Sequence, residues 1–110
     1  MTKKIKKIPL SHPGKLMYEE FMEPLEISAY RLAKDIGVPL TRITNIIQGK
    51  RAISPETALL LAQYFRMSER FFLNLQSHYD LEMAKDMMEK SHRKPVKPFQ
   101  GLDQRPHPQM

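Results

Sequence analysis

The stretch that decides the fold is Ala29-Tyr-Arg-Leu-Ala-Lys-Asp-Ile-Gly-Val-Pro-Leu-Thr-Arg-Ile-Thr-Asn-Ile-Ile-Gln48. Its apolar residues recur every three or four positions, which predicts two successive helices. Ala33 is small enough to let two helices cross closely, and Gly37 can take the positive φ of a sharp turn between them. The stretch therefore has the residue types that a helix-turn-helix motif requires.

The second helix of the motif is predicted from about Leu40 to Gln48, with Pro39 opening it and Gly49 closing it. Its isoleucines fall at helical spacing, so one face points into the core and the other faces outward. The inward residues form an apolar wedge shared with the first helix of the motif, made of Leu32, Ile36, Val38, Ile43 and Ile46, with Ile47 also pointing inward. The outward face is polar and mostly uncharged, and consists of Thr41, Arg42, Thr44, Asn45 and Gln48.

These outward side chains are suited to the base edges of DNA. An arginine can bind guanine bidentately, Asn and Gln can pair with adenine, and threonine offers a hydroxyl group and a methyl group. Lys50 and Arg51 follow directly, where they would contact phosphates and contribute little sequence preference. The alternative is an ordinary amphipathic helix with a solvated polar face. We expect seven DNA-contacting residues, namely Thr41, Arg42, Thr44, Asn45, Gln48, Lys50 and Arg51.

Helical spacing continues on both sides of the motif, and no stretch alternates in the manner of a strand. Helix boundaries are marked by capping residues, by prolines in first turns and by glycines after last turns. The predicted fold is an all-α, five-helix, repressor-like bundle. Its remaining helices run over 13–22 before Pro24, from a Ser28 cap to Gly37, over 55–65 after a Ser54 cap, and from a Ser68 cap to Glu89 or Lys90.

The chain has 110 residues and a formal net charge of +6, but the charge is uneven. Residues 1–10 have a net charge of +4, residues 91–110 have +3, and the segment between them is close to neutral. We expect one folded domain over 11–90, a basic segment over 1–10 and a disordered, proline-rich basic tail over 91–110. The basic tails alone do not indicate a nucleic-acid partner, so the argument for DNA rests on the helix-turn-helix pattern.

Several classes of protein are excluded or disfavoured by composition. Cysteine is absent, which removes disulfides, thiol nucleophiles and cysteine-rich zinc sites and suits the cytoplasm. No apolar run is long enough to span a membrane, and the start of the chain does not resemble a secretion signal. Neither a catalytic triad nor a phosphate-binding glycine loop is present. We therefore expect a soluble protein that is not an enzyme and needs no cofactor or metal.

Some residues allow two interpretations. His12 is expected to cap the first helix or pack at its start rather than to act in catalysis. His78, Asp80 and Glu82 are close in sequence, but a spacing of two residues points them to different faces of a helix, so a solvated surface is favoured over a metal site. The fifth helix carries Phe71, Phe72, Leu75, Tyr79 and Met83, and we expect Phe72 and Leu75 to be core. The other apolar residues are either core or an exposed stripe for a dimer or another partner.

Beyond these patterns, the chain resembles the phage-repressor-like (XRE) helix-turn-helix superfamily, and more closely the HigA family of antitoxins. The likeness covers about residues 11–84 and departs from many repressors in having Pro39, rather than Ser or Thr, before the reading helix. It rests on His12-Pro13-Gly14, Leu32-Ala33, Gly37-Val38-Pro39, Gly49-Lys50-Arg51-Ala52-Ile53-Ser54, Thr57-Ala58-Leu59, Leu61-Ala62 and Phe72-Leu73-Asn74-Leu75-Gln76.

The resemblance implies a homodimer that binds operator DNA, represses its own operon and neutralises a HigB-like ribonuclease toxin. Two other interpretations remain open from the sequence. One is a stand-alone transcriptional regulator with the same fold and no toxin partner. The other is a protein-interaction adaptor whose helix-turn-helix does not bind DNA.

Overall fold

The computed structural model describes residues 10–101, and this part of the chain contains helices and no strands. The all-α prediction is confirmed, with the first predicted helix divided into an α-helical start and a π-helical end. The elements are α1 (Pro13–Met17), η1 (Tyr18–Met22), α2 (Ala29–Ile36), α3 (Leu40–Ile47), α4 (Pro55–Phe65) and α5 (Phe71–Lys90).

Local capping sets most of these boundaries, as the sequence predicted. The Ser28 hydroxyl accepts the amide hydrogen of Arg31 at 3.0 Å and begins α2. Gly37 then ends α2 in the left-handed region, with φ of 77°. At α4 the Ser54 hydroxyl accepts the amide of Thr57, Pro55 occupies the first turn, and the helix has the predicted bounds.

The first helix has its predicted bounds of 13–22 but a different helix type over its second half, and the start of α5 differs from the prediction. The amide of Glu23 donates to the carbonyl of Tyr18, five residues back, at 2.8 Å, so the first helix ends in a π-helical turn. Pro24 follows and has no amide hydrogen with which to continue this pattern. The predicted side-chain cap at Ser68 is wrong, because residues 69 and 70 form a turn and α5 begins only at Phe71, whose amide donates to the backbone carbonyl of Ser68 at 3.0 Å.

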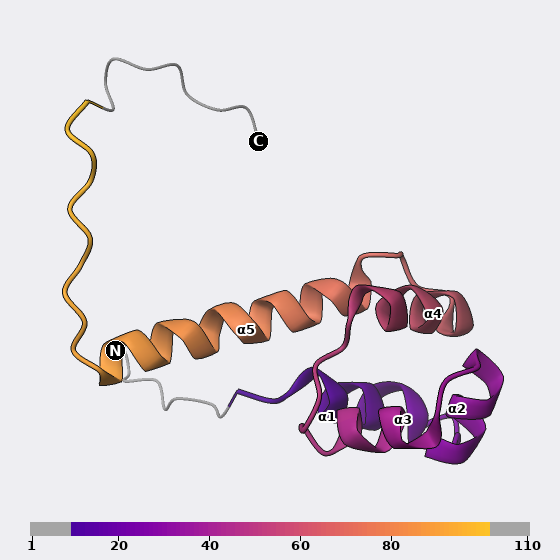
Figure 1. Ribbon diagram of the computed structural model, residues 1–110. Coiled ribbons are helices and arrows are strands. Elements are labelled where there is room, and N and C mark those ends of the chain that lie inside the picture. The colour runs from indigo at the N-terminus through magenta and orange to yellow at the C-terminus, as the bar shows by residue number, and fades with distance from the viewer. Residues whose placement is uncertain (1–9, 102–110) are drawn as a thin grey trace, which may run out of the picture.

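One hydrophobic core joins all five α-helical elements. The helices α1 to α4 form a body, and α5 leans on it with its N-terminal part, where Phe72 and Gln76 are the buried residues (Figure 1). The predicted wedge is confirmed, since Leu32, Ile43 and Ile46 are buried and Ile36 and Val38 pack against them. Within residues 10–101, the buried residues that form this core are Met17, Met22, Leu32, Ala33, Ile43, Ile46, Ile53, Ala58, Leu61, Ala62 and Phe72.

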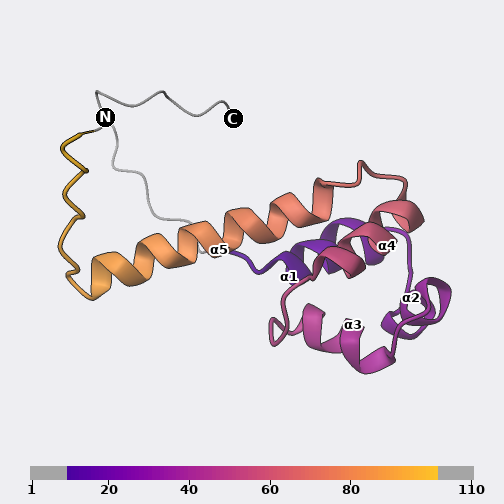
Figure 2. The same ribbon diagram turned by 45° about the horizontal axis from the view of Figure 1, so that its top comes forward.

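The C-terminal half of α5 projects well beyond this body in both ribbon views (Figures 1 and 2). After α5 the chain turns and continues as an extended segment to Gly101, outside the helical body. The predictions for residues 1–9 and 102–110 lie outside the described residues. Among the helices of the described part, none is long and apolar enough to cross a membrane.

Candidate nucleic-acid interface

The reading helix α3 is held against α1 by a close backbone approach. A side-chain carbon added at Gly14 would overlap the main-chain carbonyl group of Ile46. Only glycine therefore allows α1 to lie this near to α3. Ile43 and Ile46 complete the attachment, because both are fully buried beneath the helix.

The opposite side of α3 faces outward and carries most of the predicted polar residues. Thr41 and Gln48 are exposed, whereas Thr44 and Asn45 are half-buried. The Thr44 hydroxyl donates to the carbonyl of Thr41 at 3.2 Å. The structure thus brings Thr41, Thr44, Asn45 and Gln48 together on one face, which we call the reading face.

Arg42 is placed differently from these four residues. Its side chain is only 24% exposed, and its terminal nitrogen Nη1 lies 4.0 Å from a carboxylate oxygen of Glu56 in the first turn of α4. Its Nε is buried and has no hydrogen-bond partner among residues 10–101. Arg42 therefore lies at the edge of the reading face, beside α4.

Leu40 lies beside the reading face and was not among the predicted site residues. It is the first residue of α3, it is 43% exposed, and it stands one helical turn before Thr44. The signal was present in the sequence as the i, i+4, i+8 series of Leu40, Thr44 and Gln48. The exposure of Leu40 follows from this spacing, but a leucine has no donor or acceptor that would indicate contact with a base.

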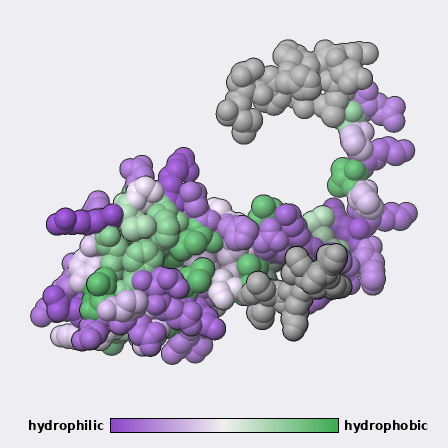
Figure 3. Space-filling view, turned by 180° about the vertical axis from the view of Figure 1, so that it is seen from behind, coloured by the Kyte–Doolittle hydropathy of each residue, from purple (hydrophilic) through white to green (hydrophobic). Residues whose placement is uncertain are grey.

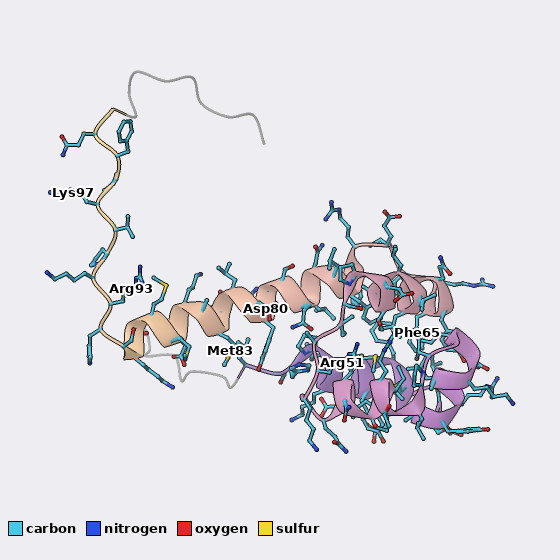
Figure 4. All side chains as sticks on the ribbon, in the orientation of Figure 1. Arg51, Phe65, Asp80, Met83, Arg93 and Lys97 are labelled. Atoms are coloured by element: carbon cyan, nitrogen blue, oxygen red, sulfur yellow. The ribbon has the colours of Figure 1, made fainter. Side chains whose placement is uncertain are left out.

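Lys50 and Arg51 are exposed in the loop that joins α3 to α4, beside which Arg51 is labelled in Figure 4. The end of this loop is fixed, because the buried amide of Ile53 donates to Oε1 of Gln76 at 2.8 Å. The side-chain amide of Gln76 in turn donates to Asp80 at 3.0 Å. The two cations therefore lie beside the C-terminal end of α3 on a loop anchored to α5.

His12 both caps and packs, as expected from the sequence. Its Nδ1 accepts the amide hydrogen of Gly14 at 2.9 Å, and its ring meets that of Tyr79 edge-on at a centroid distance of 5.0 Å. Burial lowers the pKa of His12 below its ordinary value, an effect that the carboxylate of Asp80 partly opposes. The histidine therefore links the start of α1 to α5, and the lowered pKa favours the unprotonated Nδ1 that accepts this bond.

A second link joins the motif to α4. Oδ2 of Asp35 accepts hydrogen bonds from the Tyr64 hydroxyl at 2.5 Å and from Nε of Arg31 at 2.6 Å. The hydrogen bond from Tyr64 is the largest cause that holds the pKa of Asp35 below its ordinary value, and the hydrogen bond from Arg31 is the second. The pKa of Tyr64 is raised mainly by the same bond. This link holds the end of α2, directly before the turn of the motif, against α4.

The remaining chemistry-bearing residues form no second site in the described chain. No group of three His, Cys, Asp or Glu residues between positions 10 and 101 could hold a metal ion. His78 and Asp80 are exposed, and Glu82 pairs with Lys85 at 3.2 Å. These positions form an ordinary charged helix surface.

A further surface lies on the projecting half of α5. Apolar residues occupy one side of this helix, and the other side is charged with Glu82, Lys85 and Glu89. Viewed from behind, separate apolar patches follow α5 beyond the larger apolar area of the body (Figure 3). We call this side the α5 apolar face, and it comprises Leu81, Met83, Ala84, Met87 and Met88, all of them exposed.

Comparison with known proteins agrees with this geometry. Residues 19–72, which include the reading helix, match the helix-turn-helix family model. The chain is 42% identical over 77 residues to Virulence-associated protein I of Dichelobacter nodosus, covering 70% of this chain and 71% of that one. It is 33% identical over 103 residues to Antitoxin HigA-1 of Vibrio cholerae, covering 93% and 95% of the two chains. Other relatives are named HTH-type transcriptional regulators.

Among solved structures, the Pseudomonas aeruginosa antitoxin HigA with the higBA promoter superposes with a TM-score of 0.76 at 32% identity. The match covers 82% of this chain and 98% of that one. The fold and the reading face define a DNA-binding protein of the XRE helix-turn-helix class. Within that class, the chain belongs to the HigA family.

Proposed function

We propose that the chain is the antitoxin of a toxin–antitoxin module, which acts in the cytoplasm, represses its own operon and neutralises a HigB-like ribonuclease toxin. The observation that carries the DNA part of this proposal is the reading face of α3. It is outward-facing, rich in groups that hydrogen-bond to bases, and rigidly mounted on α1 through Gly14. The similar Pseudomonas protein, whose structure includes its promoter, supports the same conclusion.

The seven predicted DNA contacts divide into two roles in this proposal. Thr41, Thr44, Asn45 and Gln48 read base edges in the major groove, with Arg42 beside them. Lys50 and Arg51 bind flanking phosphates, which sets register and makes binding dependent on salt.

The proposal includes a homodimer formed through the α5 apolar face. Four large apolar side chains on that face are exposed in the described chain, and Met87 is 65% exposed. A two-fold dimer would present its two reading helices to half-sites about 34 Å apart, one turn of DNA. Light scattering should report a dimer at tens of micromolar for the wild type and a monomer for Met87→Glu. A control, Leu25→Glu, changes an equally exposed residue outside α5 and should remain dimeric, whereas a monomeric wild type would contradict this interface.

Toxin binding is assigned to the folded body rather than to the basic tail. Exposed carboxylates on η1 and the turn after it, at Glu19, Glu20, Glu23 and Glu26, offer a potential complementary to a basic ribonuclease. A second acidic group lies on α5 at Asp80, Glu82 and Asp86. The tail has a net charge of +3, which would oppose the same attraction.

The stand-alone regulator is the alternative, and it is supported by the relatives named as transcriptional regulators. Two experiments on the native gene pair separate the two functions. A reporter fused to the upstream DNA should be repressed by the chain, and expression of the adjacent reading frame should arrest growth unless the chain is co-expressed. Repression without a toxic neighbour would establish the regulator, and failure of both would contradict the proposed function.

A further inference from the structure

The helix α3 begins with an apolar side chain, at the position where a reading helix enters the major groove. Leu40 is the first residue of α3 and is 43% exposed. The apolar residues Ile36, Val38 and Ile47 of the same motif are more buried than Leu40 and pack against the core. A large part of the Leu40 side chain therefore remains exposed at the start of α3.

An exposed leucine is by itself unremarkable on a protein surface. The position of Leu40 distinguishes it, because the N-terminal residues of a reading helix are those that contact base edges. Thr41 follows it, and Thr44 lies one turn further along the same face. Arg42, the charged residue nearest in sequence, lies near Glu56 of α4, with its Nη1 4.0 Å from the carboxylate.

The chemistry of leucine restricts what it can recognise. Its side chain has no donor or acceptor, so it would desolvate the polar edges of guanine, cytosine or adenine without replacing their hydrogen bonds to water. Thymine alone presents an apolar group in the major groove, the 5-methyl group. A leucine at this position therefore favours thymine over the other bases.

We propose that Leu40 is a specificity-determining residue whose side chain contacts the 5-methyl group of one thymine in each operator half-site. This inference rests on the proposed function, since it requires that α3 reads operator DNA. It adds an apolar contact to a site otherwise composed of hydrogen-bonding and charged residues.

The test removes the methyl group from DNA and the side chain from the protein. The preferred half-site is first selected from a random duplex pool with the full-length wild-type chain. Each thymine is then replaced in turn by uracil, which deletes only the methyl group. We expect one uracil position per half-site to weaken wild-type binding about fourfold, the effect of burying one methyl-sized apolar group. The same replacement should leave the affinity of Leu40→Ala unchanged.

Two further variants make the result specific. Leu40→Met keeps an apolar side chain and should retain the response to uracil. Leu59→Ala removes a leucine of matched exposure, 45%, from α4 and should behave as the wild type. The inference is overturned if no thymine responds to uracil, or if Leu40→Ala still responds at the same thymine. A wild-type chain that selects no sequence at all would instead overturn the proposed function, and this inference with it.

Discussion

Gly14 of α1 lies directly against the main-chain carbonyl of Ile46 in α3, so that the two helices approach with no side chain between them. This contact sets how far α3 stands from the body and hence how far its reading face extends. A side-chain carbon at position 14 would collide with the carbonyl atoms of Ile46. These atoms belong to the backbone, so they cannot move aside as a flexible side chain would.

Gly14→Ala should therefore destabilise the fold by at least about 2 kcal/mol, the effect of forcing an extra carbon into a packed interior. Urea unfolding measures the free energy. Gly37→Ala is the matched comparison, because Gly37 has open space around it and a positive φ, so its cost is only the left-handed strain of about 1 to 2 kcal/mol. Gly37→Asn should recover part of that loss. A Gly14→Ala variant as stable as the wild type would contradict the packing described.

The pH dependence of stability should contain a contribution from His12. Because its pKa is lowered in the folded chain, the unfolded chain binds the additional proton as the pH falls below the ordinary value of 6.5. The contribution of His12 is therefore complete above pH 6.5 and declines as the pH falls from there to the folded pKa. Protonation also removes Nδ1 as the acceptor for Gly14.

This prediction is checked by urea unfolding between pH 5 and pH 8. His12→Asn keeps a capping acceptor and should reduce the loss of stability at acid pH. His78→Asn, which replaces an exposed histidine of α5, should follow the wild-type profile. Identical pH profiles for His12→Asn and the wild type would rule out this role of His12.

Glu56 should restrain Arg42 and weaken the attraction of this edge of the site for DNA. Glu56→Gln removes a negative charge near the phosphates and frees the guanidinium group, so DNA affinity should rise by up to about 1 kcal/mol at low salt. The rise should be smaller when Arg42→Ala is also present, as a double-mutant cycle would measure. Glu69→Gln, an exposed acid just before α5, serves as the control for net charge. Equal gains for Glu56→Gln and Glu69→Gln would show that the Arg42 pair has no specific effect.

Deletion of residues 91–110 should preserve toxin neutralisation. The tail offers few sizeable apolar anchors, so folding it onto a partner would bury little surface against a substantial ordering cost. Its positive charge would also oppose a basic partner. The measurement is growth rescue by co-expression of the adjacent toxin with either the full chain or residues 1–90 at matched abundance. Loss of rescue in the shortened chain alone would identify the tail as the inhibitory element.

The predictable features were those determined by neighbours in sequence. Ser28, Gly37 and Ser54 act through hydrogen bonds or backbone angles within four residues, so their effect could be predicted without tertiary structure. Ser68 was misassigned because a serine before an acidic residue resembles a cap, whereas the backbone forms an extra turn first. The π-helical turn at η1 depends on a choice between two carbonyl acceptors that residue types do not reveal.

In the candidate site, too, the features determined by neighbours in sequence could be predicted and those determined by tertiary packing could not. Helical periodicity predicted which residues of α3 face outward, and the reading face has four of them. The position of Arg42 was beyond such reasoning, because it depends on how closely α4 packs and on a carboxylate fourteen residues away. The outward position of Leu40 could be predicted from the helical periodicity. Its proposed contact with thymine could not, because DNA is not part of the chain.

The most direct test of the account is whether the reading face selects DNA sequence. Fluorescence anisotropy would compare wild type, Asn45→Ala and Lys50→Ala on the upstream DNA of the chain's own gene and on an unrelated duplex, across a range of salt concentrations. Asn45→Ala should lose about 1 to 3 kcal/mol on the specific duplex alone, while Lys50→Ala should weaken both duplexes and reduce the salt slope by about one. Asn74→Ala, which removes an exposed asparagine from α5, should match the wild type. Wild-type affinity of Asn45→Ala for the specific duplex would contradict the assignment of α3 as the reading helix.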